Sequence, residues 1–237
     1  MTSTAERLAK GQKEISVAEF FERNRQVLGF DSPTKAILTS VKEAVDNALD
    51  ACEEADSLPD IRVEVNPGAH KDEFELIVED NGPGIVQRNM PNVFARLLYG
   101  SRFHAIRQSR GQQGIGISAV VLYSQLTTGT RATATSKTGH GKPAVQMELT
   151  IDTKRNLPEV HSKEVVDWDK EHGTRIRVVM KARYQGGKQS VFEYLRSTSI
   201  VNPHARIEFK DPTGTEYVFD RATEEVPKKT EAIKPHP

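Results

Sequence analysis

The chain has 237 residues, enough for one large domain or two small ones, and its composition of 36% hydrophobic and 28% charged residues is typical of a soluble globular protein. The 33 basic and 33 acidic side chains cancel, so net charge gives no indication of a nucleic-acid or membrane partner, although a local patch could still bind one. The sequence shows no membrane-spanning apolar run and no signal-peptide pattern, and its single cysteine excludes an internal disulfide, so we expect a cytoplasmic location.

The first 30 residues predict a polar arm followed by a short helix. Residues 1–14 are polar, and residues 16–28 place Val17, Phe20 and Phe21 on one apolar side behind Ser16 as the N-cap. A mobile arm joined to such a helix suits exchange with a partner subunit, and it equally suits packing on the chain's own core. We treat residues 1–30 as this arm, residues 31–220 as one domain and the charged tail 221–237 as a linker.

The stretch from Ser32 to Ala55 predicts one long helix. Ser32 and Pro33 form a typical N-cap and first-turn pair. An apolar stripe at helical spacing contains Ile37, Leu38, Val41, Ala44, Val45, Ala48, Leu49 and Cys52. A different face carries Glu43, Asn47, Asp50 and Glu54, each three or four residues after the last. A carboxylate and an amide one turn apart can face one ligand, and a solvated acidic face is the alternative.

The remaining elements predict a mixture of strands and helices without regular βαβ alternation. Strands are expected at 61–65, 74–80, 131–137, 144–152, 174–180, 205–209 and 216–219, with a weaker candidate at 163–168. Helices are expected at 90–99, from about 115 to 129, and at 190–198, while residues 100–113 have no period. This order favours an α+β fold, a two-layer α/β sandwich with a mixed, mainly antiparallel sheet.

Two glycine motifs accompany predicted strands. Asp80 ends an apolar strand, so its carboxylate should lie at the rim of the core and needs hydrogen-bond donors, of which the exocyclic amine of adenine is one candidate. Gly82 and Gly84 allow a sharp turn or a close approach to a ligand, although an ordinary Asn-Gly turn has the same composition. Gly173-Thr174 begins another strand, where the hydroxyl could hold a water or a base edge or simply belong to a β-branched strand residue.

A third glycine motif precedes a helix. Between Arg110 and Ser118 three glycines run into the helix start, where backbone N–H groups and the helix dipole form an anion site suited to phosphates. The order GxxGxG differs from both the P-loop and the Rossmann fingerprint. Taken alone, it is also the composition of an ordinary glycine-rich helix start.

Together the motifs resemble those of the GHKL ATPases, over roughly residues 33 to 180. The matching order is Glu-x3-Asn on a helix, Asp-x-Gly-x-Gly after a strand, GxxGxG before a helix, and then Gly-Thr. This family includes type II topoisomerase ATPase domains, heat-shock-ninety-type chaperones, mismatch-repair proteins and histidine kinases. The resemblance implies the Bergerat type of sandwich, with helices on one face of the sheet, and implies ATP and Mg²⁺ as ligands.

The resemblance also implies a role for each motif residue. Glu43 would polarise the attacking water, and Asn47 would offer its amide oxygen to Mg²⁺. Asp80 would accept from the adenine amino group with support from Thr174, and Gly82 and Gly84 would let the base enter. The phosphates would be wrapped by Gly111, Gln112, Gln113, Gly114, Ile115, Gly116, Ile117 and Ser118, with Ser101 and Arg102 closing the lid.

Longer runs are similar to the B-subunit family of archaeal DNA topoisomerase VI: KEAVDNALDA, LLYGSRFHAIRQSRGQQGIGISAVVLYSQLTTG and QSVFEYLRSTSIVNPHARIEF. This implies that ATP drives dimerisation of two B subunits, with residues 1–20 reaching across. It also implies a separate DNA-cleaving A subunit, DNA as the substrate of an assembly of two A and two B subunits, and no membrane partner. In this family a lysine from a later transducer domain contacts the γ-phosphate, so slow or undetectable hydrolysis is expected of residues 1–237 alone.

Two other activities are compatible with the motifs, a chaperone-type ATPase acting on protein clients and a histidine-kinase-like ATP-binding domain. The presence of Glu43 favours hydrolysis over transfer to a histidine, and the run at 97–129 favours the topoisomerase over the chaperone. The basic residues of the lid are interpreted as attracting phosphate, with contact to DNA as the alternative. They are Arg102, His104, Arg107 and Arg110.

Overall fold

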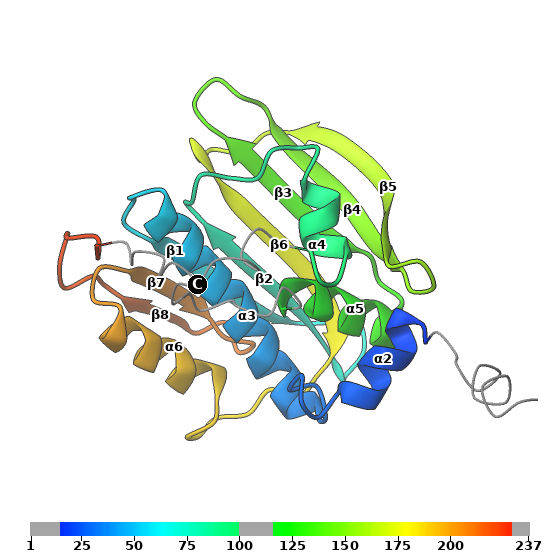
Figure 1. The fold of residues 1–237 in the computed structure, drawn as a ribbon. Coiled ribbons are helices and arrows are strands. Elements are labelled where there is room, and N and C mark those ends of the chain that lie inside the picture. The colour runs from blue at the N-terminus through cyan, green and yellow to red at the C-terminus, as the bar shows by residue number, and fades with distance from the viewer. Residues whose placement is uncertain (1–14, 100–115, 229–237) are drawn as a thin grey trace, which may run out of the picture.

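The protein folds around one mixed sheet. A computed structural model describes residues 15–99 and 116–228. Its eight-stranded sheet has the order β5-β4-β3-β6-β2-β1-β7-β8, and the helices lie over one face of it (Figure 1). Only β1 and β7 pair in parallel, and every other neighbouring pair is antiparallel. The predicted two-layer sandwich with a mainly antiparallel sheet is therefore confirmed.

The strands and helices follow the predicted order. The strands are β1 (Asp60–Pro67), β2 (Glu73–Asp80), β3 (Ala132–Thr138), β4 (Ala144–Asp152), β5 (Leu157–Val166), β6 (His172–Lys181), β7 (Arg206–Lys210) and β8 (Glu216–Phe219). The helices are α2 (Val17–Asn24), α3 (Pro33–Glu54), α4 (Met90–Ala95), α5 (Gly116–Thr128) and α6 (Val191–Val201). Ser16, Ser32 and Ser190 cap α2, α3 and α6, because each side chain accepts a hydrogen bond from the backbone N–H three residues later.

The two faces of the sheet differ in chemistry. On β1, Ile61, Val63 and Val65 are fully buried and belong to the same hydrophobic core as the apolar residues of α3. Arg62 and Glu64 point the other way and form an ion pair of 2.8 Å between Nε and Oε1. Alternation of this kind is what a strand shows when one face packs on a core and the other meets solvent. It places the core, and any site built on α3, on the helix side.

Two predicted helices end earlier than their sequences suggest. The helix expected over 16–28 ends at Asn24, and the chain then turns through Gly29, whose φ is +81°. The helix expected over 90–99 ends at Ala95, because the side chain of Asn156 binds both backbone groups of Leu97 at 2.9 and 3.0 Å. Contacts that form only in the folded chain thus replace helical hydrogen bonds at Leu97.

The weak strand candidate at 163–168 becomes β5, which starts six residues earlier than predicted, at Leu157, and ends at Val166. β5 is the edge of the sheet and pairs only with β4 among the described strands. Most of its residues are exposed on both faces, so its sequence lacks the alternation that identifies a half-buried strand. The prediction missed its first half for this reason.

The short helix α2 packs on the core of its own chain. Phe21 is fully buried, and its ring centroid lies 5.4 Å from that of Phe30 and 6.4 Å from that of Tyr123. The N–H of Val17 donates to the carbonyl of Thr153 at 2.9 Å. Packing on the chain's own core, one of the two uses predicted for this helix, is therefore seen. Exchange of the arm with a partner subunit stays a prediction, and residues 1–14 lie outside the described part. Within that described part, no helix has the length and apolarity needed to cross a bilayer.

Candidate functional site

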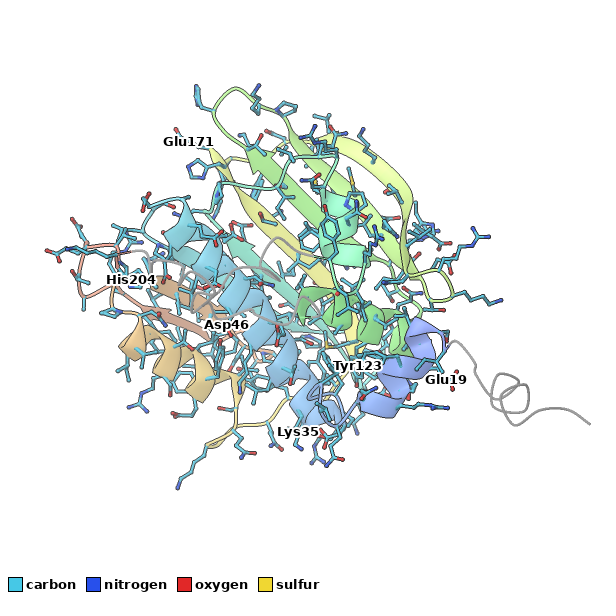
Figure 2. The ribbon with its side chains drawn as sticks, in the orientation of Figure 1. Glu19, Lys35, Asp46, Tyr123, Glu171 and His204 are labelled. Carbon is cyan, nitrogen blue, oxygen red and sulfur yellow. The ribbon has the colours of Figure 1, made fainter. Side chains whose placement is uncertain are left out.

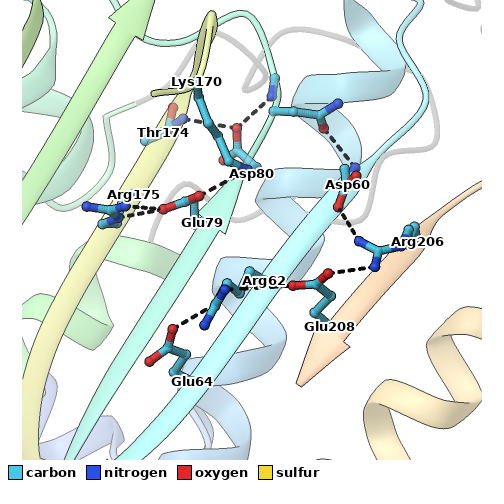
Figure 3. A network of polar contacts seen from close by, with 12 residues as sticks. Asp60, Arg62, Glu64, Glu79, Asp80, Lys170, Thr174, Arg175, Arg206 and Glu208 are labelled. Carbon is cyan, nitrogen blue, oxygen red and sulfur yellow. Dashed lines mark hydrogen bonds and ion pairs between the residues drawn. The ribbon is translucent and has the colours of Figure 1, made fainter. Parts of the chain in front are cut away.

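Asp80 is a buried carboxylate held by backbone amides. It ends β2 directly opposite Thr174 of β6, and it is 8% exposed. Its Oδ1 accepts hydrogen bonds from the N–H of Gly82 at 2.8 Å and of Thr174 at 3.1 Å (Figure 3). Burial raises the pKa of Asp80 to about 6, outweighing the two amides and the charge of Lys170. Both bonds from described residues use Oδ1, which leaves Oδ2 for a further donor.

Two glycines bring the backbone close around this carboxylate. Gly84 has a φ of +71°, and a Cβ there would overlap the carbonyl of Lys137. Gly173 has a φ of +144°, and a Cβ there would overlap the carbonyl of Asp80. Both positions therefore need glycine for conformation and for space. The sequence pointed to Gly173 only as the companion of Thr174, and its close approach to Asp80 was not predicted.

Three further residues fix the turn after Asp80 and were missed from the sequence. Asn81 binds the connection between α3 and β1 through its side chain. His172 Nδ1 lies 2.8 Å from the carbonyl of Gly82, and Ser136 Oγ accepts from the N–H of Ile85 at 2.7 Å. Asn81 and His172 stand beside predicted motif residues, which is a signal that could have found them. Ser136 has no such signal, because only the pairing of β3 with β6 brings it there.

Glu43 and Asn47 lie one turn apart on α3, and Glu43 is near the start of α5. Both are half-buried, and a Cβ at Gly116 would overlap the Glu43 carboxylate, so the two helices touch at that point. Burial raises the pKa of Glu43, the charge of Asp46 adds to this, and Lys42 opposes it. Asp46, labelled on α3 in Figure 2, accepts a hydrogen bond of 3.1 Å from the hydroxyl of Tyr194 on α6. A carboxylate with a raised pKa is a better proton acceptor near neutral pH.

Helix α3 carries Glu43 and Asn47 and also borders the turn after Asp80. A Cβ built on Gly82 would lie 3.3 Å from the Cβ of Ala51 and 3.6 Å from Sγ of Cys52, so the turn after Asp80 rests on the last third of α3. Glu43 and Ala51 are separated along the helix axis by ~12 Å. The arrangement thus offers a buried acceptor at one end and, at the other, a carboxylate and an amide beside a helix start. These features suit an elongated ligand with an amine at one end and anionic groups at the other.

The family named "Histidine kinase-, DNA gyrase B-, and HSP90-like ATPase" matches residues 34–184. The chain belongs to this ATPase family. It is 59% identical over 98% of its length to the B subunit of a type 2 DNA topoisomerase 6 from Methanosarcina barkeri, and 56% identical over 95% to that from Archaeoglobus fulgidus. The chain spans 38% and 37% of those two proteins, respectively.

Solved structures confirm the fold of this ATPase. The ATPase domain of Thermus thermophilus gyrase B aligns with a TM-score of 0.56 and 17% identity, covering 92% of this chain and 53% of that one. The ATPase region of Saccharomyces cerevisiae topoisomerase II aligns with a TM-score of 0.55 and 14% identity, covering 88% and 62%. At this identity the likeness concerns the fold alone, and the fold is the one that the motifs predicted.

Part of the predicted phosphate loop of the ATPase lies within the described residues. Gly116, Ile117 and Ser118 form the first turn of α5, with Ser118 buried. Outside the described residues are Gly111, Gln112, Gln113, Gly114, Ile115, Ser101 and Arg102, together with the other basic residues of the lid, His104, Arg107 and Arg110. Asp50, for which the sequence allowed a place on a solvated face, is instead 6% exposed.

The donor set of the ATPase fits a magnesium nucleotide better than a bare metal ion. Among the described residues no cluster of three or more His, Cys, Asp or Glu side chains could hold a metal by itself. Mg²⁺ in nucleotide sites usually takes only one or two protein ligands, with phosphate oxygens and waters as the rest. A single amide oxygen such as that of Asn47 is consistent with this pattern.

The acidic pair at the end of β2 is balanced by neighbouring cations. Glu79 Oε1 lies 3.0 Å from Nζ of Lys170, and Glu79 Oε2 accepts from Nε of Arg175 at 2.6 Å (Figure 3). The guanidinium of Arg175 also lies 5.1 Å from the ring centroid of Trp168. These cations neutralise Glu79, whose charge would otherwise add to that of Asp80.

Proposed function

We propose that this chain binds Mg-ATP along α3 and supplies residues for its hydrolysis within the full B subunit of a type II DNA topoisomerase, while residues 1–237 alone hydrolyse it slowly or not detectably. One observation carries the proposal: α3 places Glu43 against the start of α5 and, about two turns later, supports the turn that follows Asp80. The similarity to topoisomerase 6 B subunits over nearly the whole chain supports the topoisomerase assignment.

The end of the site at Asp80, here called the base end, supplies a hydrogen-bond acceptor for the adenine base. Asp80 receives two backbone hydrogen bonds at Oδ1 and presents Oδ2 to the amino group of adenine. Thr174, opposite Asp80 in the sheet, supports that contact through its hydroxyl. Gly82 and Gly84 let the turn after Asp80 pack closely against α3 and against Lys137, which holds this turn beside the ring. A buried acceptor selects for an amine, because a carbonyl in its place would leave both oxygens without a donor.

At the phosphate end, Glu43 acts on the water that attacks the γ-phosphate. Its raised pKa lets the carboxylate accept a hydrogen bond strongly and so orient and polarise that water. Asn47, one helical turn further on, would hold the metal through its amide oxygen. Mg²⁺ would neutralise charge on the phosphate oxygens when bound. The N–H groups at the start of α5, from Gly116 to Ser118, donate to the phosphates.

Calorimetric titration of Mg-ATP into the wild type, Asn47→Ala and Asp80→Asn tests the binding proposal. We expect both variants to lose affinity, Asp80→Asn by more than tenfold, which corresponds to about 1.4 kcal/mol. Asp211→Asn is the matched control, since Asp211 is as buried as Asp80 but lies in the turn between β7 and β8. Equal affinity in wild type, Asn47→Ala and Asp80→Asn would remove the site assignment.

We further propose that ATP drives two such B subunits together within an assembly that includes a DNA-cleaving A subunit. The supporting observation is the identity to topoisomerase 6 B subunits, whose full length this chain covers only in part. Sedimentation with and without a non-hydrolysable ATP analogue tests dimerisation, and a chain that binds the analogue yet stays monomeric contradicts it. Stimulation of hydrolysis by DNA in the full assembly separates a topoisomerase from a chaperone-type ATPase.

A further inference from the structure

Asn81 uses both the oxygen and the nitrogen of its side-chain amide to tie the turn after Asp80 to another part of the chain. Its Oδ1 accepts a hydrogen bond from the N–H of Asp60 at 2.8 Å and from Sγ of Cys52 at 3.3 Å. Its Nδ2 donates to the carbonyl of Leu58 at 3.0 Å. The three partners lie at the end of α3, on the connection from α3 to β1, and at the first residue of β1. Donor and acceptor types match on both sides of the amide, so its orientation follows from its partners.

The segment that Asn81 binds is itself firmly held. The carbonyl of Pro59 accepts from the N–H of Arg206 at 2.9 Å and from Nη2 of Arg221 at 3.1 Å. Arg206 also forms an ion pair of 3.3 Å with Asp60 (Figure 3). Residues 58–60 are thus fastened to β7 and to the segment that follows β8. A turn tied to such an anchor cannot shift without breaking several hydrogen bonds together.

Asn81 lies in the sequence between the two residues that form the acceptor proposed for adenine, Asp80 and Gly82. The residue before it supplies the Asp80 carboxylate, and the residue after it supplies the Gly82 N–H that donates to that carboxylate at 2.8 Å. Fixing the side chain of Asn81 therefore fixes the direction in which Asp80 presents Oδ2. Its Oδ1 already accepts two hydrogen bonds and one N–H of Nδ2 donates to the carbonyl of Leu58, so the known bonds of this side chain go to the protein.

We infer that Asn81 is a positioning residue, which aims the Asp80 carboxylate at the amino group of a 6-aminopurine and so sets the preference for adenine. This inference rests on the proposed ATP site. It assigns to Asn81 a role in selectivity, distinct from the general contribution of a buried hydrogen-bonded amide to stability.

The test compares ATP with inosine triphosphate, which carries a carbonyl where ATP carries the amine. Calorimetry with the magnesium forms of both nucleotides gives a ratio of affinities for the wild type and for Asn81→Ala. We expect the wild type to prefer ATP and Asn81→Ala to lose roughly tenfold in ATP affinity with little change for inosine triphosphate. Asn202→Ala, which loses a buried amide bonded to the carbonyl of Thr198, should keep the ratio of the wild type.

A second variant covers the case in which Asn81→Ala does not fold. Asn81→Asp keeps the size of the side chain and the acceptor for the N–H of Asp60 but loses the donor to Leu58, so a partial loss of the ratio is expected. An unchanged ratio in the Asn81 variants that fold overturns the inference while the ATP site stands. If the wild type itself fails to bind ATP, the proposed function falls, and the role of Asn81 with it.

Discussion

The two ends of the candidate site are held in place by different means. At the base end, Asp80, Asn81 and Ser136 are all engaged by hydrogen bonds between strands and turns that are far apart in the sequence. At the phosphate end, the side chains of Glu43 and Asn47 make no hydrogen bond to another residue of the described part, and their positions follow from α3 itself.

This difference separates what each end can contribute. An acceptor locked by backbone amides is preorganised for one shape of ligand, which favours selectivity. Side chains on a rigid helix keep their polar atoms available, which suits groups that must act on water or a metal. The comparison predicts that changes at the base end alter folding and recognition together, whereas changes at the phosphate end mainly alter chemistry.

The largest effect on stability and binding is expected from Gly173→Ala, which places a side chain against the backbone of Asp80 at the base end. A Cβ there overlaps the carbonyl of Asp80 at a φ of +144°, so we expect a loss of about 3 kcal/mol in the free energy of unfolding, together with weaker ATP binding. Urea denaturation and calorimetry measure the two. Gly139→Ala is the matched control, because Gly139 has a φ of +149° with nothing within 4 Å of a built Cβ. Equal losses in the two variants would show that the close approach to Asp80 is not important.

Asp80→Asn should make the protein without nucleotide more stable while it weakens ATP binding. Burial raises the pKa of Asp80 from 3.8 to about 6 in the folded state, so the ionised carboxylate is disfavoured there. Its contribution to stability is fully present below pH 3.8 and is lost as the pH rises through about 6, a difference of about 3 kcal/mol at most.

The amide of Asp80→Asn keeps an acceptor for the N–H groups of Gly82 and Thr174 and carries no charge. We therefore expect the free energy of unfolding to rise by about 1 to 3 kcal/mol at pH 8 and to be unchanged near pH 4. Thermal unfolding at both pH values measures this difference. A variant that is less stable than the wild type at pH 8 would show that the carboxylate is well solvated or paired in the fold. The comparison of the two ends would then lose its main electrostatic support.

The sequence predicts the parts of the candidate site that depend on local pattern. Glu43 and Asn47 were proposed because helical spacing places residues four apart on one face, and Asp80 because it ends an apolar strand. The parts that were missed depend on register between distant segments. Ser136 reaches the turn only through the pairing of β3 with β6, and α4 ends early only because of Asn156, 59 residues away.

The same reason explains the partial success at the glycines. Gly82 and Gly84 are visible as a motif, and a sharp turn follows from their composition. The need for glycine at 173 arises because β6 pairs antiparallel with β2 and brings that residue against the carbonyl of Asp80. The predicted pattern located both strands but gave no information on which residues face each other.

A smaller effect concerns the pH dependence of ATP recognition at the base end. The adenine amino group donates to an ionised carboxylate, so ATP affinity should fall as the pH drops through about 6, where Asp80 gains a proton. Titrations between pH 5 and 8 with inosine triphosphate as the control remove the effect of phosphate protonation, which the two nucleotides share. A constant ratio of affinities over this range would argue that Asp80 does not contact the base.

The smallest effect is expected at the phosphate end, from Asp46→Asn. The charge of Asp46 raises the pKa of Glu43, after the larger contribution of burial, so its removal should lower that pKa. The acid limb of the rate of ATP hydrolysis, measured in the full assembly, should shift to lower pH while the affinity for ATP stays unchanged. Tyr194→Phe removes the hydroxyl that binds Asp46 at 3.1 Å without removing the charge, so it should shift the limb less. If Asp46→Asn instead weakens ATP binding and leaves the pH profile in place, the phosphate end is held by a polar network like the base end, and the contrast between the two ends does not hold.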